Sequence, residues 1–192
     1  LMELLESTFP FLLQPLNLDE NSGKGATVYA GWGANQSADF LAFADADGAV
    51  GPDEVVRVLK QIRDDSEAES TLYATSRIED EETQVQRRAI RNLGGLTFRW
   101  LRKQLFSFPI EDTQCGFKVI PGSFFRENWE KLYEAGFAFD LELLYRAQQA
   151  GLKMKEIPVT WADKKDGHMN FFNSAGLFKD LLRLKGRLDK EA

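Results

Sequence analysis

The sequence predicts an α/β fold in which a mostly parallel sheet is flanked by helices. Short apolar segments alternate with longer amphipathic segments, the order that builds parallel sheets with right-handed crossovers. After Asp39, the strand expected over residues 39–44 is apolar on both faces, as a buried parallel strand should be. The 192 residues are 43% hydrophobic, enough to bury a core, and no linker divides them, so we expect one domain over residues 1–192.

Each element follows from the local pattern. Strands are expected where short apolar runs lie between turn residues: 11–18, 39–44, 70–76, 116–120 and 155–161. Helices are expected where apolar residues recur at helical spacing: 26–35, 52–62, 81–106, 121–135, 140–150 and 174–190. Pro52 suits the first position of its helix, and Gly94-Gly95 should interrupt the long basic helix.

Composition excludes several classes of function. With 24 basic and 30 acidic residues the net charge is −6, which argues against nucleic acid as a partner. One cysteine, Cys115, and one histidine, His168, leave no internal disulfide and no histidine-based metal cluster. No run approaches the roughly 20 apolar residues of a membrane-spanning helix, so we expect none in this chain.

Two aspartates follow the second expected strand. Asp45 and Asp47 are two residues apart where a parallel strand ends, so both carboxylates can face one Mg²⁺ or Mn²⁺ ion. Ligands of such sheets bind beyond the carboxyl ends of the strands. The alternative is an ordinary solvated acidic turn, which a pair of aspartates alone does not exclude.

Basic residues suggest sites for anions. Lys24 lies between two glycines just before a helix, where backbone N–H groups and the helix dipole favour an anion. Arg77, Arg87 and Arg91 are concentrated in an otherwise acidic chain, and the last two share a helix face, so they can grip a phosphate. An exposed turn and a solvated basic face are the structural alternatives.

The remaining candidates are acidic and amide side chains. An uncommon polar loop over residues 112–118 separates apolar elements and contains Asp112 and Gln114. Asp140 can simply cap a helix, with Glu142 favourable in its first turn, so neither residue requires a function.

Five motifs together carry a family resemblance. In order, they are Asn21-Ser-Gly-Lys-Gly25, Asp45-Ala-Asp47, Asp112-Thr-Gln-Cys-Gly-Phe-Lys118, Phe139-Asp-Leu-Glu142 and Glu156-Ile-Pro-Val-Thr-Trp161. They resemble the family-2 glycosyltransferases that charge polyprenyl phosphates, of the dolichyl-phosphate β-glucosyltransferase and dolichol-phosphate mannosyltransferase type. Single motifs of this length arise by chance, but five in register over about residues 9–185 make chance matching improbable.

The resemblance implies a GT-A-like fold and an inverting, metal-dependent hexosyltransferase. The donor would be UDP-glucose or GDP-mannose, and the acceptor a dolichyl or undecaprenyl phosphate at the cytoplasmic face of a membrane. By position, it implies metal binding by Asp45 and Asp47, nucleotide or phosphate binding by Asn21, Lys24, Arg77, Arg87 and Arg91, and sugar and acceptor contacts by Asp112, Gln114, Asp140 and Glu142. A phosphate acceptor is already an anion near neutral pH and hardly needs a general base; for a hydroxyl acceptor, Asp140 would be the base.

The sequence also departs from the family pattern. Family members begin with a strand carrying Pro-x-Tyr-Asn-Glu and a second strand ending in Asp-Asp-Gly-Ser, and neither motif occurs here. The resemblance therefore implies a sheet incomplete at its N-terminus by about two βα units. Near residues 166–169, where the family usually has Gly-Ser-Lys, this chain has Asp-Gly-His-Met.

Three alternatives stay open. The chain could be a catalytically silent fragment that binds a nucleotide sugar. It could also be a haloacid-dehalogenase-type phosphatase with Asp45 as nucleophile, because residues 40–48 resemble that motif, although no matching acidic loop follows. Finally, the basic amphipathic helix expected over 174–190 could either lie on an anionic membrane surface or pack against the sheet.

Overall fold

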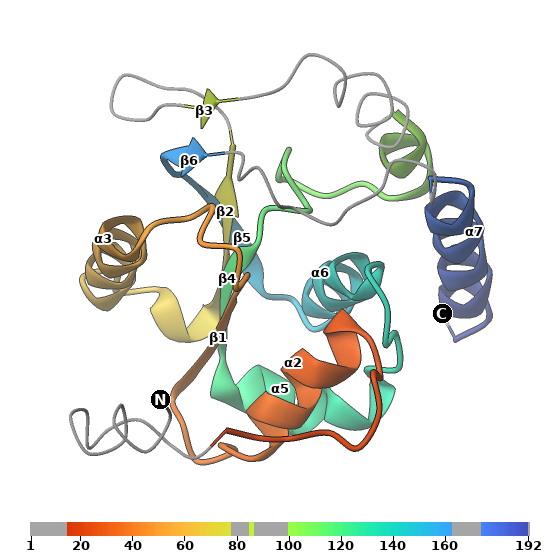
Figure 1. The fold of residues 1–192 in the computed structure, drawn as a ribbon, viewed down its shortest axis with the longest axis horizontal. Helices are drawn as coiled ribbons and strands as arrows, with labels where there is room; N and C mark the ends of the chain where they lie inside the picture. The colour runs from red at the N-terminus through yellow and green to blue at the C-terminus, as the bar shows by residue number, and fades with distance from the viewer. Residues whose placement is uncertain (1–14, 78–84, 87–99, 163–173, 192) are drawn as a thin grey trace.

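The computed structural model describes residues 15–77, 85–86, 100–162 and 174–191 (Figure 1). Its strands are β1 (Phe40–Ala44), β2 (Thr71–Ser76), β3 (Val85–Gln86), β4 (Phe117–Pro121), β5 (Lys153–Pro158) and β6 (Trp161–Ala162). Its helices are α2 (Lys24–Gly33), α3 (Pro52–Arg63), α5 (Gly122–Asn128), α6 (Phe139–Gln149) and α7 (Ser174–Glu191), with 3-10 turns η1 (Ala68–Ser70) and η3 (Trp129–Lys131). Residues 100–105 are also helical. The expected α/β class is confirmed.

The main sheet is mixed, which corrects the expectation of a mostly parallel one. Its order is β1-β4-β2-β5, and β4 runs antiparallel to both of its neighbours while β2 and β5 are parallel. Both β2 and β4 are buried along their whole length, whereas β1 alternates between exposed and buried residues. The prediction that β1 is covered on both faces was therefore wrong, because an apolar run does not reveal whether a strand lies at the edge of the described sheet.

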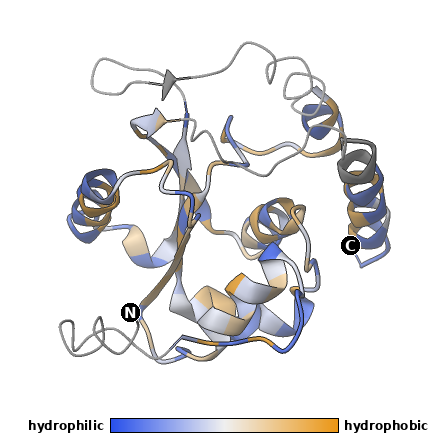
Figure 2. Ribbon diagram, in the orientation of Figure 1, coloured by the Kyte–Doolittle hydropathy of each residue, from blue (hydrophilic) through white to orange (hydrophobic). Residues whose placement is uncertain are grey.

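Helices cover the sheet on two sides (Figure 1). On one face, α2, α5 and α6 pack on the sheet through a core that includes Trp32, Phe125 and Phe139. On the other face, α3 packs through Val58 and Ile62. Figure 2 shows that α3 carries hydrophobic and hydrophilic sides, as expected for a helix with one face on a sheet.

Helix α7 packs on the protein itself. Its residues Leu181, Leu184 and Leu188 are buried against Phe106 and Leu141, next to α6 and the helical residues 100–105. Of the two alternatives for this segment, packing therefore holds over residues 179–191, although the partners are helices and not the sheet. Over these residues, Leu181, Leu184 and Leu188 are already covered by the protein. Within the described ranges, no helix has the length and apolar character needed to cross a bilayer.

Several element boundaries differ from the expectations. Residues 15–18 form no strand, and the earlier part of that expected strand lies outside the described residues. The expected helix over 81–106 is helical at 100–105, but residues 85–86 form β3, which pairs with β6. The strand expected over 155–161 is divided into β5 and β6, and the helix after Pro121 ends early, at Asn128, before η3. Strands of two residues are too short to show any periodicity.

Candidate active site at the carboxyl ends of β1 and β2

The antiparallel direction of β4 brings polar segments together at one edge of the sheet. Because β4 runs opposite to β1 and β2, its beginning lies where they end, and Phe117 pairs with Ala44. The backbone N–H of Asp45 donates to the carbonyl of Gly116 over 2.7 Å. The loop that precedes β4 therefore lies beside Asp45, after β1, and Arg77, after β2.

Lys24 and Asp45 form an ion pair in this region. Lys24 is the first residue of α2, and its Nζ lies 2.7 Å from Oδ1 of Asp45. The same ammonium group lies 5.1 Å from the ring centroid of Phe43 and 5.4 Å from that of Phe139. Lys24 and Asp45 keep 21% and 37% of their side-chain surface exposed, so the pair is accessible from solvent. Two residues predicted to bind anion and metal thus neutralise each other.

The carboxylate of Asp45 also fits closely against Gly116. A Cβ atom at position 116 would lie 2.1 Å from Oδ2 of Asp45, so a side chain there would displace the carboxylate. Asp47 differs, because it is exposed and its Oδ1 accepts a hydrogen bond of 2.9 Å from the backbone N–H of Ala49. This bond shapes the turn that Gly48, with a φ of 65°, allows.

The glycines before α2 are explained by close packing. Gly23 has a φ of 92°, and a Cβ there would lie 2.5 Å from the carbonyl oxygen of Ala135. That oxygen accepts a hydrogen bond from the N–H of Ala26 in the first turn of α2. Asn21 is exposed, and its Oδ1 accepts from the N–H of Gly23 over 3.2 Å. A protein carbonyl therefore uses part of the expected anion site, and nucleotide binding by Asn21 stays a prediction.

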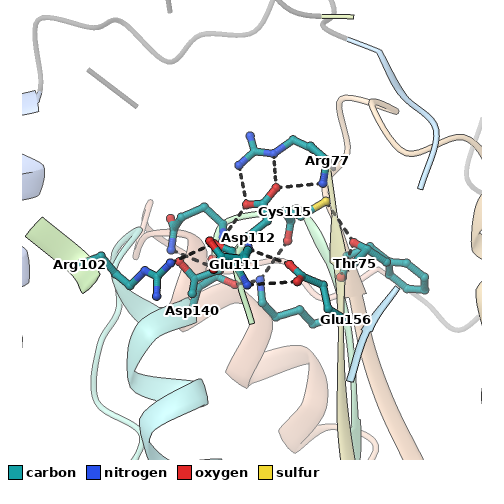
Figure 3. Close-up of polar contacts among 12 residues, drawn as sticks. Thr75, Arg77, Arg102, Glu111, Asp112, Cys115, Asp140 and Glu156 are labelled. Carbon is teal, nitrogen blue, oxygen red and sulfur yellow. Dashed lines mark hydrogen bonds and ion pairs between the residues drawn. The ribbon is translucent and has the colours of Figure 1, made fainter. Parts of the chain in front are cut away.

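Arg77 and Asp112 form a second, more extensive ion pair (Figure 3). The guanidinium group donates from Nε and Nη2 to the two carboxylate oxygens, over 2.6 and 2.7 Å, and the backbone N–H of Arg77 donates to the same carboxylate. Burial alone would raise the pKa of Asp112, but the hydrogen bonds and charge of Arg77 hold it below its usual value. Arg77 also lies over the ring of Trp161, at 5.5 Å.

Glu156 of β5 holds the same loop in place. Its carboxylate accepts hydrogen bonds from the backbone N–H groups of Asp112, over 2.7 Å, and Glu111, over 3.1 Å (Figure 3). Gln114 is half-buried, and its backbone N–H donates to Asp112 over 3.2 Å. The loop is thus fixed by Glu156 of β5 and by Arg77 after β2, and sugar or acceptor contacts by Asp112 and Gln114 stay predictions.

A buried ion pair joins β4 to α6. The Nζ of Lys118 lies 2.5 Å from Oδ1 of Asp140, and the two side chains are 0% and 2% exposed. Lys118 also donates to the carbonyl of Cys115 and lies 5.4 Å from the ring of Phe43. Burial raises the pKa of Asp140, while the charges of Lys118 and Lys24 oppose this rise. Asp140 is therefore enclosed with its counter-ion and does not face solvent.

Glu142 ties α6 to its surroundings. It is fully buried and accepts hydrogen bonds from the backbone N–H groups of Tyr133 and Glu134, over 2.9 and 2.6 Å. It also pairs with Arg187 of α7. Burial raises the pKa of Glu142, and its backbone donors and Arg187 oppose this effect. These contacts are enough to explain why the carboxylate of Glu142 is buried, and no substrate is needed to explain it. A contact of Glu142 with sugar or acceptor therefore stays a prediction.

The single cysteine lies inside the protein next to this loop. Cys115 is 1% exposed. The hydroxyl group of Thr75 is shared as a donor between the Sγ of Cys115, at 3.1 Å, and the carbonyl oxygen of Phe117. Burial raises the pKa of the Cys115 thiol, so the thiolate that a nucleophile requires is disfavoured.

The structure brings together some of the predicted site residues but not all of them. Lys24, Asp45, Arg77 and Asp112 lie at one edge of the sheet. Arg87 and Arg91 lie outside the described residues. Sequence reasoning did not select Lys118 or Glu156, although both belong to the quoted motifs.

A signal for Lys118 was present in the sequence. A lysine inside the apolar strand Phe117–Pro121 occupies a buried position, and a buried charge needs a partner. The sequence did not reveal that this partner is Asp140, 22 residues further along the chain.

Two carboxylates predicted to hold a divalent ion lie in this region, Asp45 in its ion pair with Lys24 and Asp47 exposed. Asp45 and Asp47 supply the oxygen ligands that Mg²⁺ and Mn²⁺ prefer, and both retain exposed surface. Among the described residues, no group of three or more histidine, cysteine, aspartate or glutamate side chains could hold a metal ion. Two carboxylates alone would leave several positions of an ion to water or phosphate oxygens, as is typical of magnesium bound with a nucleotide, and metal binding by Asp45 and Asp47 stays a prediction.

Comparisons with known proteins identify relatives of the chain. It is 31% identical to the human dolichyl-phosphate β-glucosyltransferase over 176 residues, which cover 90% of this chain and 54% of the human protein. The Trichomonas vaginalis and Drosophila melanogaster enzymes of the same name are 30% and 32% identical, covering 88% and 77% of the chain and 50% and 46% of those proteins.

The chain spans about half the length of the curated relatives it matches. No family model matches it, and no solved structure matches it significantly. The resemblance that the five motifs indicated is confirmed by these relatives. The chain is thus a relative of the dolichyl-phosphate β-glucosyltransferases and matches about half of the length of those proteins.

Proposed function

We propose that this chain contributes the site of a glucosyltransferase that moves glucose from a nucleotide diphosphate sugar to dolichyl phosphate. The donor that we propose is UDP-glucose. The names of the relatives support the sugar and the acceptor. The observation that carries the proposal is the convergence of Asp45, Lys24 and Arg77 where β1 and β2 end and β4 begins.

The proposed reaction needs little from the protein besides binding and charge. An oxygen of the acceptor phosphate bonds to C1 of the glucose, and the bond from C1 to the diphosphate breaks, so that the nucleoside diphosphate leaves with the electron pair. A Mg²⁺ or Mn²⁺ ion held by Asp45 and Asp47 would offset the negative charge of this leaving group. Lys24 supplies a positive charge beside the same carboxylate.

An acceptor that is already ionised agrees with the environment of Asp140. The second ionisation of a phosphate monoester has a pKa of about 6, so the nucleophile carries its charge near neutral pH. A general base has to lie within hydrogen-bond distance of the proton it removes. Asp140 is 2% exposed and bound to Lys118, which disfavours the alternative of a hydroxyl acceptor with Asp140 as the base.

The test is transfer of radioactive glucose from UDP-glucose to dolichyl phosphate in the presence of Mn²⁺. Asp47→Asn removes a proposed metal ligand and should lower the rate at least about 100-fold. Asp53→Asn makes the same chemical change at an exposed position in the first turn of α3 and should leave the rate unchanged.

The other two candidate functions predict different results. If UDP-glucose binds but no glucose is transferred, the chain is a silent nucleotide-sugar-binding fragment and the proposal is wrong. A phosphatase would release phosphate from a phosphomonoester and form an aspartyl-phosphate at Asp45. If activity survives both Asp47→Asn and EDTA, the metal is not part of the mechanism.

A further inference from the structure

Lys24 occupies the position next to Asp45 where a divalent ion would bind. Its ammonium group lies 2.7 Å from Oδ1 of Asp45, and Oδ2 of the same carboxylate is held against Gly116. The carboxylate therefore has little freedom to turn away from the lysine. An ion bound to Asp45 would lie within a few ångströms of the ammonium group, where two positive charges repel strongly.

Among the described residues, Asp45 is the carboxylate that forms an ion pair with Lys24. Asp140 is close enough for its charge to interact with that of Lys24, but it is paired with Lys118 at 2.5 Å inside the protein. The rings of Phe43 and Phe139 lie beside the ammonium group on the protein side. An ammonium group displaced from Asp45 would therefore need an anion from solution as its new partner.

We propose that Lys24 is a built-in counter-ion of Asp45, which a divalent ion displaces so that the freed ammonium group can pair with the anion that arrives with the ion. The inference rests on the metal site of the proposed function. It adds that Lys24 competes with the metal in the unliganded chain. The anion would be a diphosphate, because it ligates a divalent ion and offers further oxygens to a neighbouring lysine.

The first test measures the affinity for Mn²⁺ without nucleotide, by the electron paramagnetic resonance signal of the free ion. Lys24→Met should tighten binding by about fivefold, as expected if the ion no longer has to break an ion pair worth about 1 kcal/mol. Lys60→Met removes the same charge from an exposed position of α3 and should change the affinity by less than about twofold. In an Asp45→Asn background, Lys24→Met should have no further effect, because the competition requires both partners.

The second test follows Lys24 directly. Acetic anhydride acetylates free amines, and mass spectrometry reports the extent at each lysine. Saturating Mg²⁺ should increase the acetylation of Lys24 at least about twofold, since its carboxylate partner is then occupied, and leave that of Lys60 unchanged.

The outcomes separate this inference from the proposed function. If Mn²⁺ binds through Asp45 with equal affinity in the wild type and in Lys24→Met, Lys24 does not compete, and the inference is wrong while the metal site stands. If Asp45→Asn does not weaken Mn²⁺ binding, the inference and the metal site are both wrong. Glucose transfer in the presence of EDTA then decides whether the proposed reaction proceeds without metal.

Discussion

The buried pair of Lys118 and Asp140 should respond strongly to the loss of one partner. Lys118→Met removes the cation and leaves a carboxylate that is 2% exposed without its main counter-charge. Breaking a buried pair in this way costs about 3–5 kcal/mol, whereas replacing both partners by apolar residues is often nearly neutral. We therefore expect Lys118→Met to lose about 3–5 kcal/mol of the free energy of unfolding at pH 8, and the double variant with Asp140→Leu to lose less.

The pH dependence of the free energy of unfolding of Lys118→Met gives a second, independent test. Burial already raises the pKa of Asp140, and removal of Lys118 takes away the main opposing charge. The folded Lys118→Met variant then binds a proton more readily than the unfolded chain, so its stability rises as the pH is lowered from 8 through the raised pKa. The slope cannot exceed about 1.4 kcal/mol per pH unit for one proton.

Urea titrations between pH 5 and 8 would measure both quantities, with unfolding followed by the fluorescence of the four tryptophans. Lys60→Met, on the surface of α3, is the control and should stay within about 0.5 kcal/mol of the wild type. A loss below about 1 kcal/mol in Lys118→Met, or a double variant as unstable as the single one, would refute the reasoning.

Three further substitutions test other contacts. Gly25→Ala should destabilise the chain by at least about 2 kcal/mol, because the new Cβ would lie 2.2 Å from a backbone oxygen. The control Gly33→Ala, whose Cβ would have no described atom within 4 Å, should be neutral or slightly stabilising. Thermal unfolding measures both differences. Asp112→Asn should cost about 2 kcal/mol at pH 7 in urea titrations. The wild-type carboxyl has a lowered pKa when folded, so this difference should shrink as the pH falls below 3.8. Leu184→Ala, at a buried position, should cost about 2–5 kcal/mol, and the 55% exposed Leu182→Ala less than about 0.5 kcal/mol; equal losses would contradict the packing of α7.

Much of the fold could be predicted because its elements carry local signals. The apolar stripe after Pro52 and the run ending at Ala44 correspond to α3 and β1, with boundaries within a residue or so. Strand direction could not be predicted, because the side-chain pattern of a short buried strand is the same for parallel and antiparallel neighbours. The direction of β4 depends on contacts between distant segments.

The candidate site could be predicted in part for the same reason. Asp45 and Arg77 each follow an apolar strand, and they lie at one edge of the sheet because β1 and β2 run in the same direction, as the expectation of parallel strands assumed. Their partners were not predictable, since the pairs Lys24–Asp45 and Arg77–Asp112 join residues 21 and 35 positions apart. The contacts of Glu142 were not predictable for a different reason, because a carboxylate that binds backbone N–H groups has the same sequence signature as one that binds a substrate.

The charges between α6 and α7 restrict how the C-terminal helix can dock. Glu142 of α6 pairs with Arg187, and Arg146, one turn later on α6, pairs with Glu191, one turn later on α7. Sliding α7 by one turn would place Arg187 opposite Arg146 and set like charges against each other. The same slide would carry Asp180 into the buried place of Leu184, so it would also bury a charge. Hydrophobic burial and the alternation of sign along the seam thus disfavour the shifted alignment together.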